Sequence, residues 1–103
     1  ARLTGILFVL CAGSGRAIQV MFRDAGRHRS PNAGWPESAM AGALGIRLSG
    51  PRTYGETTSN EPWLNSGARD PSGADIRHAL ELYRRVVIAI AFILALLGWA
   101  NLT

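Results

Sequence analysis

Hydrophobic residues gather at the two ends of the chain and leave a polar, arginine-rich stretch between them. The first apolar run covers residues 3–12, and the second covers residues 86–102, which contain no charged side chain. A helix needs about 20 predominantly apolar residues to cross a bilayer, with a lower limit of about 17. The second run therefore predicts a C-terminal membrane-spanning helix. The first run is too short to span, and we interpret it as the end of a transmembrane helix that begins upstream.

The helical pattern continues upstream of the second run, so the C-terminal helix is expected to begin well before the membrane. Apolar side chains recur there with helical spacing at Ile76, Ala79, Leu80, Tyr83 and Val87. Ser72 or Asp75 is suited to cap the start of this helix. The alternative is a buried helix of a soluble protein, but a helix that is apolar on all sides is less common there. We favour the membrane-spanning interpretation.

Two short helices are expected in the polar middle of the chain. A Gly-Ser-Gly sequence at residues 13–15 should end the first apolar helix, and residues 16–26 then predict a short amphipathic helix. The apolar stripe of this helix consists of Ile18, Met21, Phe22 and Ala25. Its other face is charged, so we expect the apolar stripe to make the contact with neighbouring helices.

The second short helix is predicted to begin at Pro36, because proline lacks a backbone N–H and suits the first helical position. In this interpretation Trp35 is the cap residue. Glu37 then lies in the first turn, where the helix dipole favours a negative charge. Small side chains at residues 38–46 should let another helix approach closely, and Gly50-Pro51 should end the helix.

Residues 52–73 form the longest segment without a helical pattern. The segment is rich in Pro, Gly, Ser, Thr and Asn, and it carries the aromatic residues Tyr54 and Trp63. A loop of this length is usually functional or mobile. The two aromatic side chains are therefore candidates either for ligand contacts or for anchoring the loop to the surface.

Charge and cysteine content narrow the class of protein. All eleven basic residues are arginines that precede residue 86, and seven acidic residues leave a net charge of +4. This balance favours an anionic partner such as lipid headgroups, a phosphate metabolite or nucleic acid. Arg84 and Arg85 adjoin the C-terminal apolar run, so the polar middle is expected on the cytoplasmic side. The single cysteine, Cys11, excludes a disulfide within the chain and is expected to be a packing residue.

Candidate chemistry concentrates in residues 23–37. Two arginines, Arg23 and Arg27, stand one helical turn apart, and Asp24 and His28 have the same spacing. The simplest interpretation is a solvated face on which Asp24 balances the two arginines. The alternative is an anion site in which Asp24 orients a cation or binds a metal ion. A Trp, an Asn and a Glu close to a helix start, beside four arginines, favour a site for an anion.

Several motifs together resemble one known family. They are Arg23-Asp24 with His28, Ser-Pro-Asn-Ala-Gly-Trp-Pro-Glu at residues 30–37, Ala-Met-Ala-Gly-Ala-Leu-Gly at residues 39–45, Leu-x-Gly-Pro-x-x-Tyr-Gly at residues 48–55, and Asp-Ile-Arg-x-Ala-Leu-x-Leu-Tyr-Arg-Arg at residues 75–85. This order is similar to that of the adenosylcobinamide-phosphate synthase family of cobalamin biosynthesis (CbiB/CobD type). One departure is Leu-Asn-Ser-Gly at residues 64–67, where family members tend to have Leu-Gly-Asp-Gly.

The resemblance implies a multi-spanning membrane enzyme roughly three times this length, of which the chain is the C-terminal part. Family members join the propionate carboxylate of adenosylcobyric acid to the amine of aminopropanol or its O-phosphate, using ATP and Mg²⁺. A carboxylate does not react with an amine until it is activated, most simply as an acyl phosphate. Cations must therefore gather around a carboxylate and a phosphate together.

On this resemblance, Asp24, His28 and Glu37 are the expected catalytic residues. Asp24 and Glu37 would bind Mg²⁺ or take the amine proton. The expected substrate-binding residues are Arg23, Arg27, Ser30, Asn32, Gly34, Trp35 and Tyr54, with Arg29 as a further cation. Trp35 would pack on the corrin or fix the turn. The metal ligands and the position of ATP stay open.

We therefore expect an all-α fragment of a multi-spanning membrane protein in three parts. Residues 1–13 would end a transmembrane helix, residues 14–75 would carry the motif on the cytoplasmic side, and residues 76–103 would include the span. The expected partners are a corrinoid, an amino-alcohol phosphate, the bacterial inner membrane and the rest of the polypeptide. The fragment alone is not expected to be active.

Two alternatives to this function differ from it in sequence. A non-catalytic membrane sensor or accessory protein of the same superfamily would share the topology but lose the Ser-Pro-Asn motif, which is intact here. A membrane-anchored nucleic-acid binder would use lysine and interleaved aromatic residues. The chain has no lysine, so nucleic acid is not an expected partner.

Overall fold

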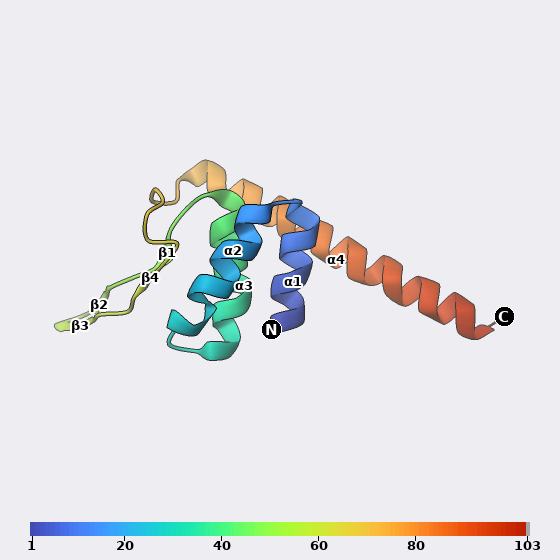
Figure 1. The fold of residues 1–103 in the computed structure, drawn as a ribbon, viewed down its shortest axis with the longest axis horizontal. Helices are drawn as coiled ribbons and strands as arrows, with labels where there is room; N and C mark the ends of the chain where they lie inside the picture. Colours follow the sequence, from blue (N-terminus) through green and yellow to red (C-terminus); the bar gives the residue numbers. More distant parts are fainter. Residues whose placement is uncertain (103) are drawn as a thin grey trace.

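The computed structural model describes residues 1–102 and, within them, every side chain except those of Pro31, Arg52 and Tyr54. Three helices form a short bundle, a β-hairpin projects from one side of it, and a long helix leaves on the other side (Figure 1). The elements are α1 (Arg2–Ala12), α2 (Gly15–Asp24), the 3₁₀-helix η1 (Ala25–Arg27), α3 (Pro31–Leu44), β1 (Leu48–Ser49), β2 (Arg52–Tyr54), β3 (Thr57–Ser59), β4 (Trp63–Leu64) and α4 (Gly73–Leu102). The molecule is therefore elongated, with principal extents of 60 × 26 × 25 Å.

The turn between α1 and α2 follows the prediction. Gly13 ends α1 in the left-handed backbone region, and its N–H donates to the carbonyl groups of Val9 and Leu10. Ser14 caps α2, because its hydroxyl oxygen accepts a hydrogen bond from the Ala17 N–H at 3.2 Å. The predicted break between the two helices is thus confirmed.

The buried face of α2 differs from the predicted stripe. Met21 and Ala25 are buried as expected, but Ile18 is 44% exposed and Phe22 is 67% exposed. The buried positions are Ala17, Val20, Met21 and Asp24. A Cβ atom added at Gly42 of α3 would lie 2.8 Å from the Cα of Ala17. At this close contact Ala17 and Val20 face α3, while Ile18 and Phe22 are left exposed.

Helix α3 begins earlier than predicted. Ser30 is its cap residue, with the hydroxyl oxygen accepting from the Ala33 N–H at 3.4 Å, and Pro31 takes the first helical position. The predictions that Pro36 starts the helix, that Trp35 caps it and that Glu37 lies in the first turn are therefore wrong. Both prolines suit a first position by chemistry, but only Pro31 follows a residue whose side chain caps the helix.

The same helix ends at Leu44, with Gly45 as its C-terminal cap in the left-handed region. The prediction that Gly50-Pro51 ends the helix is therefore wrong. Pro36 lies inside α3. Because it has no N–H, the carbonyl of Asn32 lacks the hydrogen bond that a residue four positions later would normally supply.

Residues 48–64 form a two-part antiparallel hairpin, so the predicted all-α class is wrong in this segment. Leu48 pairs with Leu64 at the base, and Arg52 pairs with Ser59 further out. Trp63 at the base lies under the guanidinium of Arg47, which is 3.9 Å from the ring centroid. The structure is otherwise mostly helical.

The long helix α4 starts where the sequence predicted. Asp75 accepts hydrogen bonds from the backbone N–H of Ser72 at 2.7 Å and from its hydroxyl at 3.0 Å, so both predicted cap residues take part. Only 6% of its most apolar 18-residue window is buried, and the helix is long and apolar enough to cross a membrane. A core helix of a soluble protein would be mostly buried.

The core lies where α4 crosses the bundle. Its buried side chains are Phe8, Val9, Ala17, Met21, Ala39, Leu82 and Val86. Cys11 is half-buried and packs against this cluster, as expected for a packing residue. The core holds the C-terminal half of α3 against α4 and leaves its N-terminal half, which carries the motif, at the far end of the bundle (Figure 1).

Candidate functional site

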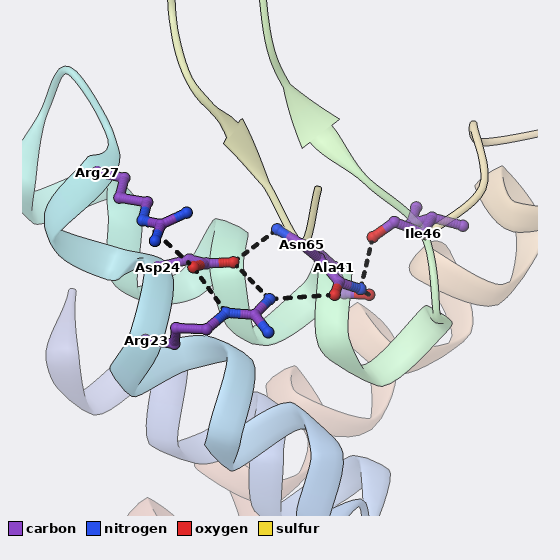
Figure 2. A network of polar contacts seen from close by, with 6 residues as sticks. All are labelled: Arg23, Asp24, Arg27, Ala41, Ile46 and Asn65. Carbon is purple, nitrogen blue, oxygen red and sulfur yellow. Dashed lines mark hydrogen bonds and ion pairs between the residues drawn. The ribbon is translucent and has the colours of Figure 1, made fainter. Parts of the chain in front are cut away.

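The motif divides into two groups of polar side chains, one on either side of η1. The first group surrounds Asp24 at the end of α2 (Figure 2). Arg23 binds the Asp24 carboxylate with two atoms: Nε lies 2.9 Å from Oδ1, and Nη2 lies 2.9 Å from Oδ2. The Nε of Arg27 lies 3.7 Å from Oδ1. The expected balance of Asp24 with the two arginines is confirmed, but Asp24 is fully buried, so the expectation of a solvated face is wrong.

Asn65 completes the first group from the base of the hairpin, directly after β4. Its backbone N–H donates to Asp24 Oδ2 at 2.7 Å, and its side-chain Oδ1 accepts from Arg23 at 3.3 Å. Its amide Nδ2 donates to the carbonyl groups of Ala41 at 3.3 Å and Ile46 at 3.0 Å. Asn65 therefore joins the end of β4 to the C-terminus of α3 and to α2 (Figure 2).

Asn65 is one of two departures from the Leu-Gly-Asp-Gly pattern, the other being Ser66, and the backbone at position 65 suits both glycine and asparagine. The φ angle of Asn65 is 59°, in the left-handed region that favours glycine and also accepts asparagine. The side chain is almost fully buried and hydrogen-bonded. Asn65 was not among the predicted site residues, and its position after a short strand gave no sign of its contacts.

The Asp24 carboxylate is fully buried and occupied on both oxygens. The hydrogen bond from Arg23 lowers the pKa of Asp24, burial opposes this shift, and the hydrogen bond from the Asn65 N–H lowers it further. The carboxylate is therefore ionised at neutral pH, and both of its oxygens accept hydrogen bonds from Arg23 or Asn65. Its place in the structure is that of an internal support for the junction of α2, α3 and the hairpin.

The second group consists of His28, Ser30 and Glu37. The Ser30 backbone N–H donates to His28 Nδ1 at 2.8 Å, and His28 Nε2 lies 3.0 Å from Glu37 Oε2. Because Nδ1 accepts a hydrogen bond, the ring proton is on Nε2 and points at the Glu37 carboxylate. The side chains are 13% exposed for His28 and 40% exposed for Glu37. Glu37 thus reaches the surface, unlike Asp24, and His28 lies mostly buried behind it.

Gly34 explains how His28 reaches Glu37. A Cβ atom at Gly34 would lie 2.1 Å from the carbonyl oxygen of Ala25 and 2.9 Å from the Cβ of His28. Only glycine lets η1 pass this close to the first turn of α3. Gly34 was predicted to bind substrate. In the structure it has a packing function, which brings His28 and Glu37 together.

An aromatic group joins the start of α1, the end of α2 and α3. Trp35 is half-buried, Phe22 meets it edge to face with ring centroids 5.7 Å apart, and the Arg2 guanidinium lies 5.2 Å from the Trp35 ring centroid. Arg2 and Phe22 were not predicted as site residues. Phe22 was assigned to the apolar stripe that faces the core. Sequence periodicity did not show that its side chain would be exposed.

The remaining predicted residues lie around these two groups. Arg29 is 80% exposed, with its Nη1 4.0 Å from a carboxylate oxygen of Glu61, and Asn32 is exposed on the first turn of α3. Ser30 uses its hydroxyl as the α3 cap. Tyr54 lies in β2, in the outer part of the hairpin, and its side chain is outside the described residues.

Of the two motif carboxylates, Asp24 and Glu37, only Glu37 keeps an oxygen available to a cation. No group of three or more His, Cys, Asp or Glu side chains suited to a metal ion occurs within residues 1–102. Asp24, the carboxylate predicted to share a metal with Glu37, already has both oxygens bound by Arg23 and Asn65. Mg²⁺ bound by protein and nucleotide prefers one or two free carboxylates together with phosphate oxygens.

Comparisons with known proteins give a consistent result. Residues 1–83 match the family model described as "CobD/Cbib protein". The chain is 55% identical over 99 residues to "Cobalamin biosynthesis protein CobD" of Rhodobacter capsulatus, which covers 95% of the chain and 32% of that protein. The same named protein of Brucella suis is 53% identical over 91 residues, covering 81% of the chain and 28% of the relative.

A more distant relative shows the same pattern. "Cobalamin biosynthesis protein CobD" of Mycobacterium tuberculosis is 48% identical over 102 residues, covering 94% of the chain and 32% of the relative. The chain thus spans between 28% and 32% of the length of these three relatives. No solved structure matches the chain.

Proposed function

The chain belongs to the CobD/CbiB protein family, and from this membership we propose that it forms part of a membrane enzyme that makes an amide bond in cobalamin biosynthesis. The intact protein would join the propionate carboxylate of adenosylcobyric acid to the amine of aminopropanol or its O-phosphate. The observation that carries the proposal is the His28–Glu37 pair, in which His28 holds a carboxylate that stays 40% exposed, within the motif that resembles the family's.

Amide formation makes two demands that this part of the chain can meet. The amine must lose a proton before its nitrogen can form the bond, and Glu37 offers a half-exposed carboxylate to hold the ammonium group and accept that proton. The substrates bring carboxylate and phosphate groups, whose negative charge must be balanced. Arg29, with a weak contact at 4.0 Å, has hydrogen-bond donors left for an anion.

His28 would act on Glu37 and not on the substrate. Its Nδ1 is held by the Ser30 N–H at 2.8 Å, which fixes the ring, and its Nε2–H donates to Glu37 Oε2 at 3.0 Å. One oxygen of Glu37 is thereby held in place while the other stays available to the amine. His28 is thus a positioning residue, and Glu37 is the catalytic residue of the pair.

Asp24 and Arg23 take a different part in the proposal from the one expected. Their mutual contacts leave Asp24 without a free oxygen and Arg23 with most of its donors in use. They would hold η1 in place so that His28 and Arg27 face the substrate. Phe22, 67% exposed and edge to face with Trp35, supplies apolar surface that a corrin ring could contact.

ATP and Mg²⁺ are implied by the resemblance alone and would supply the activation of the carboxylate. Activation as an acyl phosphate would provide the phosphate that leaves when the amide bond forms, and the residues that hold ATP are expected to include other parts of the intact protein. We also propose that α4 spans the inner membrane from residue 86 onward, with the motif on the cytoplasmic side. Its length and exposed apolar surface support this, together with Arg84 and Arg85 next to the span.

The test uses the intact enzyme, purified from membranes in detergent and supplied with adenosylcobyric acid, aminopropanol phosphate, ATP and Mg²⁺. Removing an oriented acid or base typically costs about 100-fold or more in rate, so Glu37→Gln should lower cobinamide phosphate formation by that factor at normal protein abundance. Glu56→Gln, an exposed residue of the hairpin turn, is the matched control and should keep full turnover. Normal turnover of Glu37→Gln would show that the chemistry lies elsewhere in the protein.

A further inference from the structure

Six arginines of this chain show two contrasting surroundings. Arg23, Arg47 and Arg69 each bind a carboxylate, with shortest nitrogen–oxygen distances of 2.9, 2.5 and 2.6 Å. Arg77, Arg84 and Arg85 on α4 are exposed, and no hydrogen bond or ion pair joins them to another residue in the range 1–102. These three arginines are the free cations closest to the apolar half of α4.

Helical geometry places these arginines along one side of α4. Positions 77, 81, 84, 85 and 88 follow the spacing of a single helix face. A shallow cavity of about 220 Å³ on this face is lined by Glu81, Arg84, Arg85 and Ile88. A second cavity of about 290 Å³ beside it is lined by Tyr83, Arg84, Val87 and Ile88. Arg84 and Ile88 line both cavities, so a cation and an apolar side chain meet there.

The two ends of these cavities differ in chemistry. Arg85 is the last charged residue of the chain, and residues 86–102 carry no charge. Ile88 and Phe92, one turn apart, are 64% and 63% exposed. The first cavity sets two arginines against one carboxylate, Glu81, and so carries a net positive charge. A ligand that fits is therefore anionic at the level of Arg84 and apolar at the level of Ile88 and beyond. A phospholipid with an anionic headgroup has this arrangement, whereas a soluble phosphate compound lacks the apolar part.

The two neighbouring arginines are not equivalent. A third cavity, of about 300 Å³, brings Arg85 together with Ala12 and Leu44, the last residues of α1 and α3. The carbonyl groups at the C-terminal ends of helices attract cations. The ends of α1 and α3 therefore balance part of the positive charge of Arg85. Arg84 lines only the two outer cavities, and its guanidinium is the better placed of the two to bind a lipid phosphate.

We infer that Arg84 and Arg85, with Ile88 beneath them, form a binding site for the headgroup phosphate of an anionic phospholipid at the membrane boundary. The arginines bind the phosphate oxygens, and an acyl chain follows Ile88 and Phe92. A zwitterionic lipid brings its own cation next to the phosphate, so the site discriminates by net charge. Each arginine near an anionic lipid contributes about a fivefold gain in affinity. This site does not depend on the proposed amide synthesis.

The experiment titrates the intact protein in detergent with pyrene-labelled phosphatidylglycerol and, separately, with pyrene-labelled phosphatidylcholine. The wild type should bind phosphatidylglycerol at least tenfold more tightly. The double variant Arg84→Gln/Arg85→Gln should lose about 25-fold in affinity for phosphatidylglycerol, at about fivefold per arginine, with little change for phosphatidylcholine. Arg29→Gln removes the same charge at the far end of the bundle and should change neither affinity.

Two further arms keep the result unambiguous. Arg84→Lys/Arg85→Lys preserves the charge and should keep most of the preference, so equal losses in the lysine and glutamine variants would overturn the site as a charge-based one. Inorganic phosphate should not displace the labelled lipid. Displacement by inorganic phosphate, or unchanged phosphatidylglycerol binding by the glutamine variant, would show that no lipid site exists at Arg84 and Arg85.

Discussion

The two groups of the motif lie on either side of η1 and differ in almost every physical respect. Asp24 is 0% exposed and is held by Arg23, Arg27 and Asn65. Glu37 is 40% exposed, and within residues 1–102 its carboxylate has one polar contact, with His28. Both residues are carboxylates in one short motif. Their surroundings make the first a structural element and leave the second free to meet a ligand, so a motif need not have one function throughout.

The strongest test of this difference is to remove the buried carboxylate. Asp24→Ala leaves two arginines without their partner and the Asn65 N–H without its acceptor. Breaking a buried pair costs about 3–5 kcal/mol. We expect about 3 kcal/mol here, because both arginine side chains are half-exposed. Thermal unfolding of the intact protein in detergent measures the loss.

Glu37→Gln provides the contrast for that experiment. It removes a half-exposed charge, and changes of this kind usually alter stability by less than about 0.5 kcal/mol. The comparison between the two groups breaks down if Glu37→Gln lowers the unfolding temperature as much as Asp24→Ala does.

A second test separates the two groups by moving η1 away from α3. Gly34→Ala places a Cβ atom 2.1 Å from the Ala25 carbonyl oxygen, so the backbone of η1 must shift. Overpacking of this kind costs about 1–3 kcal/mol, and His28 should lose its contact with Glu37. We expect lower stability and lower turnover together. Gly67→Ala serves as the control, because a Cβ atom at Gly67 would meet nothing within 4 Å.

A third test concerns the link from the hairpin to α3. Asn65→Gly fits the left-handed backbone without strain but removes the side-chain hydrogen bonds to Ala41 and Ile46. Each such bond contributes about 0.5–1.5 kcal/mol, and glycine adds flexibility to the unfolded chain. We expect a loss of about 2 kcal/mol in unfolding free energy. An unchanged unfolding midpoint would mean that the hairpin does not support the C-terminus of α3.

The smallest expected effect is on the acid side of the pH–stability curve. Arginine contacts lower the pKa values of Asp24, Asp70 and Asp75 in the folded chain. A lowered folded pKa stabilises the protein above the unfolded value of about 4, and this contribution is lost as the pH falls through the folded pKa. The unfolding temperature should therefore fall at pH values below about 4. Asp24→Asn should flatten part of this fall, and an equally steep curve in that variant would exclude Asp24 as a contributor.

The helices could largely be predicted from the sequence, because each has a periodic pattern or a clear end. The start of α3 could not be fixed by proline alone, since Pro31 and Pro36 both suit the first position. The Ser30 side chain was the signal that decides between them. The hairpin escaped prediction because its strands are two or three residues long, too short to show alternation.

The candidate site was predicted only in part, for a similar reason. The balance of Asp24 with Arg23 and Arg27 follows from local spacing and is confirmed by the structure. The contact of Asn65 with Asp24 joins residues 41 positions apart, and no local pattern can reveal it. The roles proposed for His28, Asn32 and Glu37 in amide synthesis stay predictions.

One feature of α4 has a mechanical consequence. Leu82 and Val86, one turn apart, are buried in the core of the bundle, and the helix continues unbroken to Leu102. The bundle therefore has a fixed orientation about the axis of α4 relative to the apolar half of that helix. One residue inserted after Val86 would rotate the bundle by about 100° around the axis of α4 without breaking a contact inside it. Helical phase therefore sets which side of the bundle, and so which side of the motif, faces any neighbouring helix in the membrane.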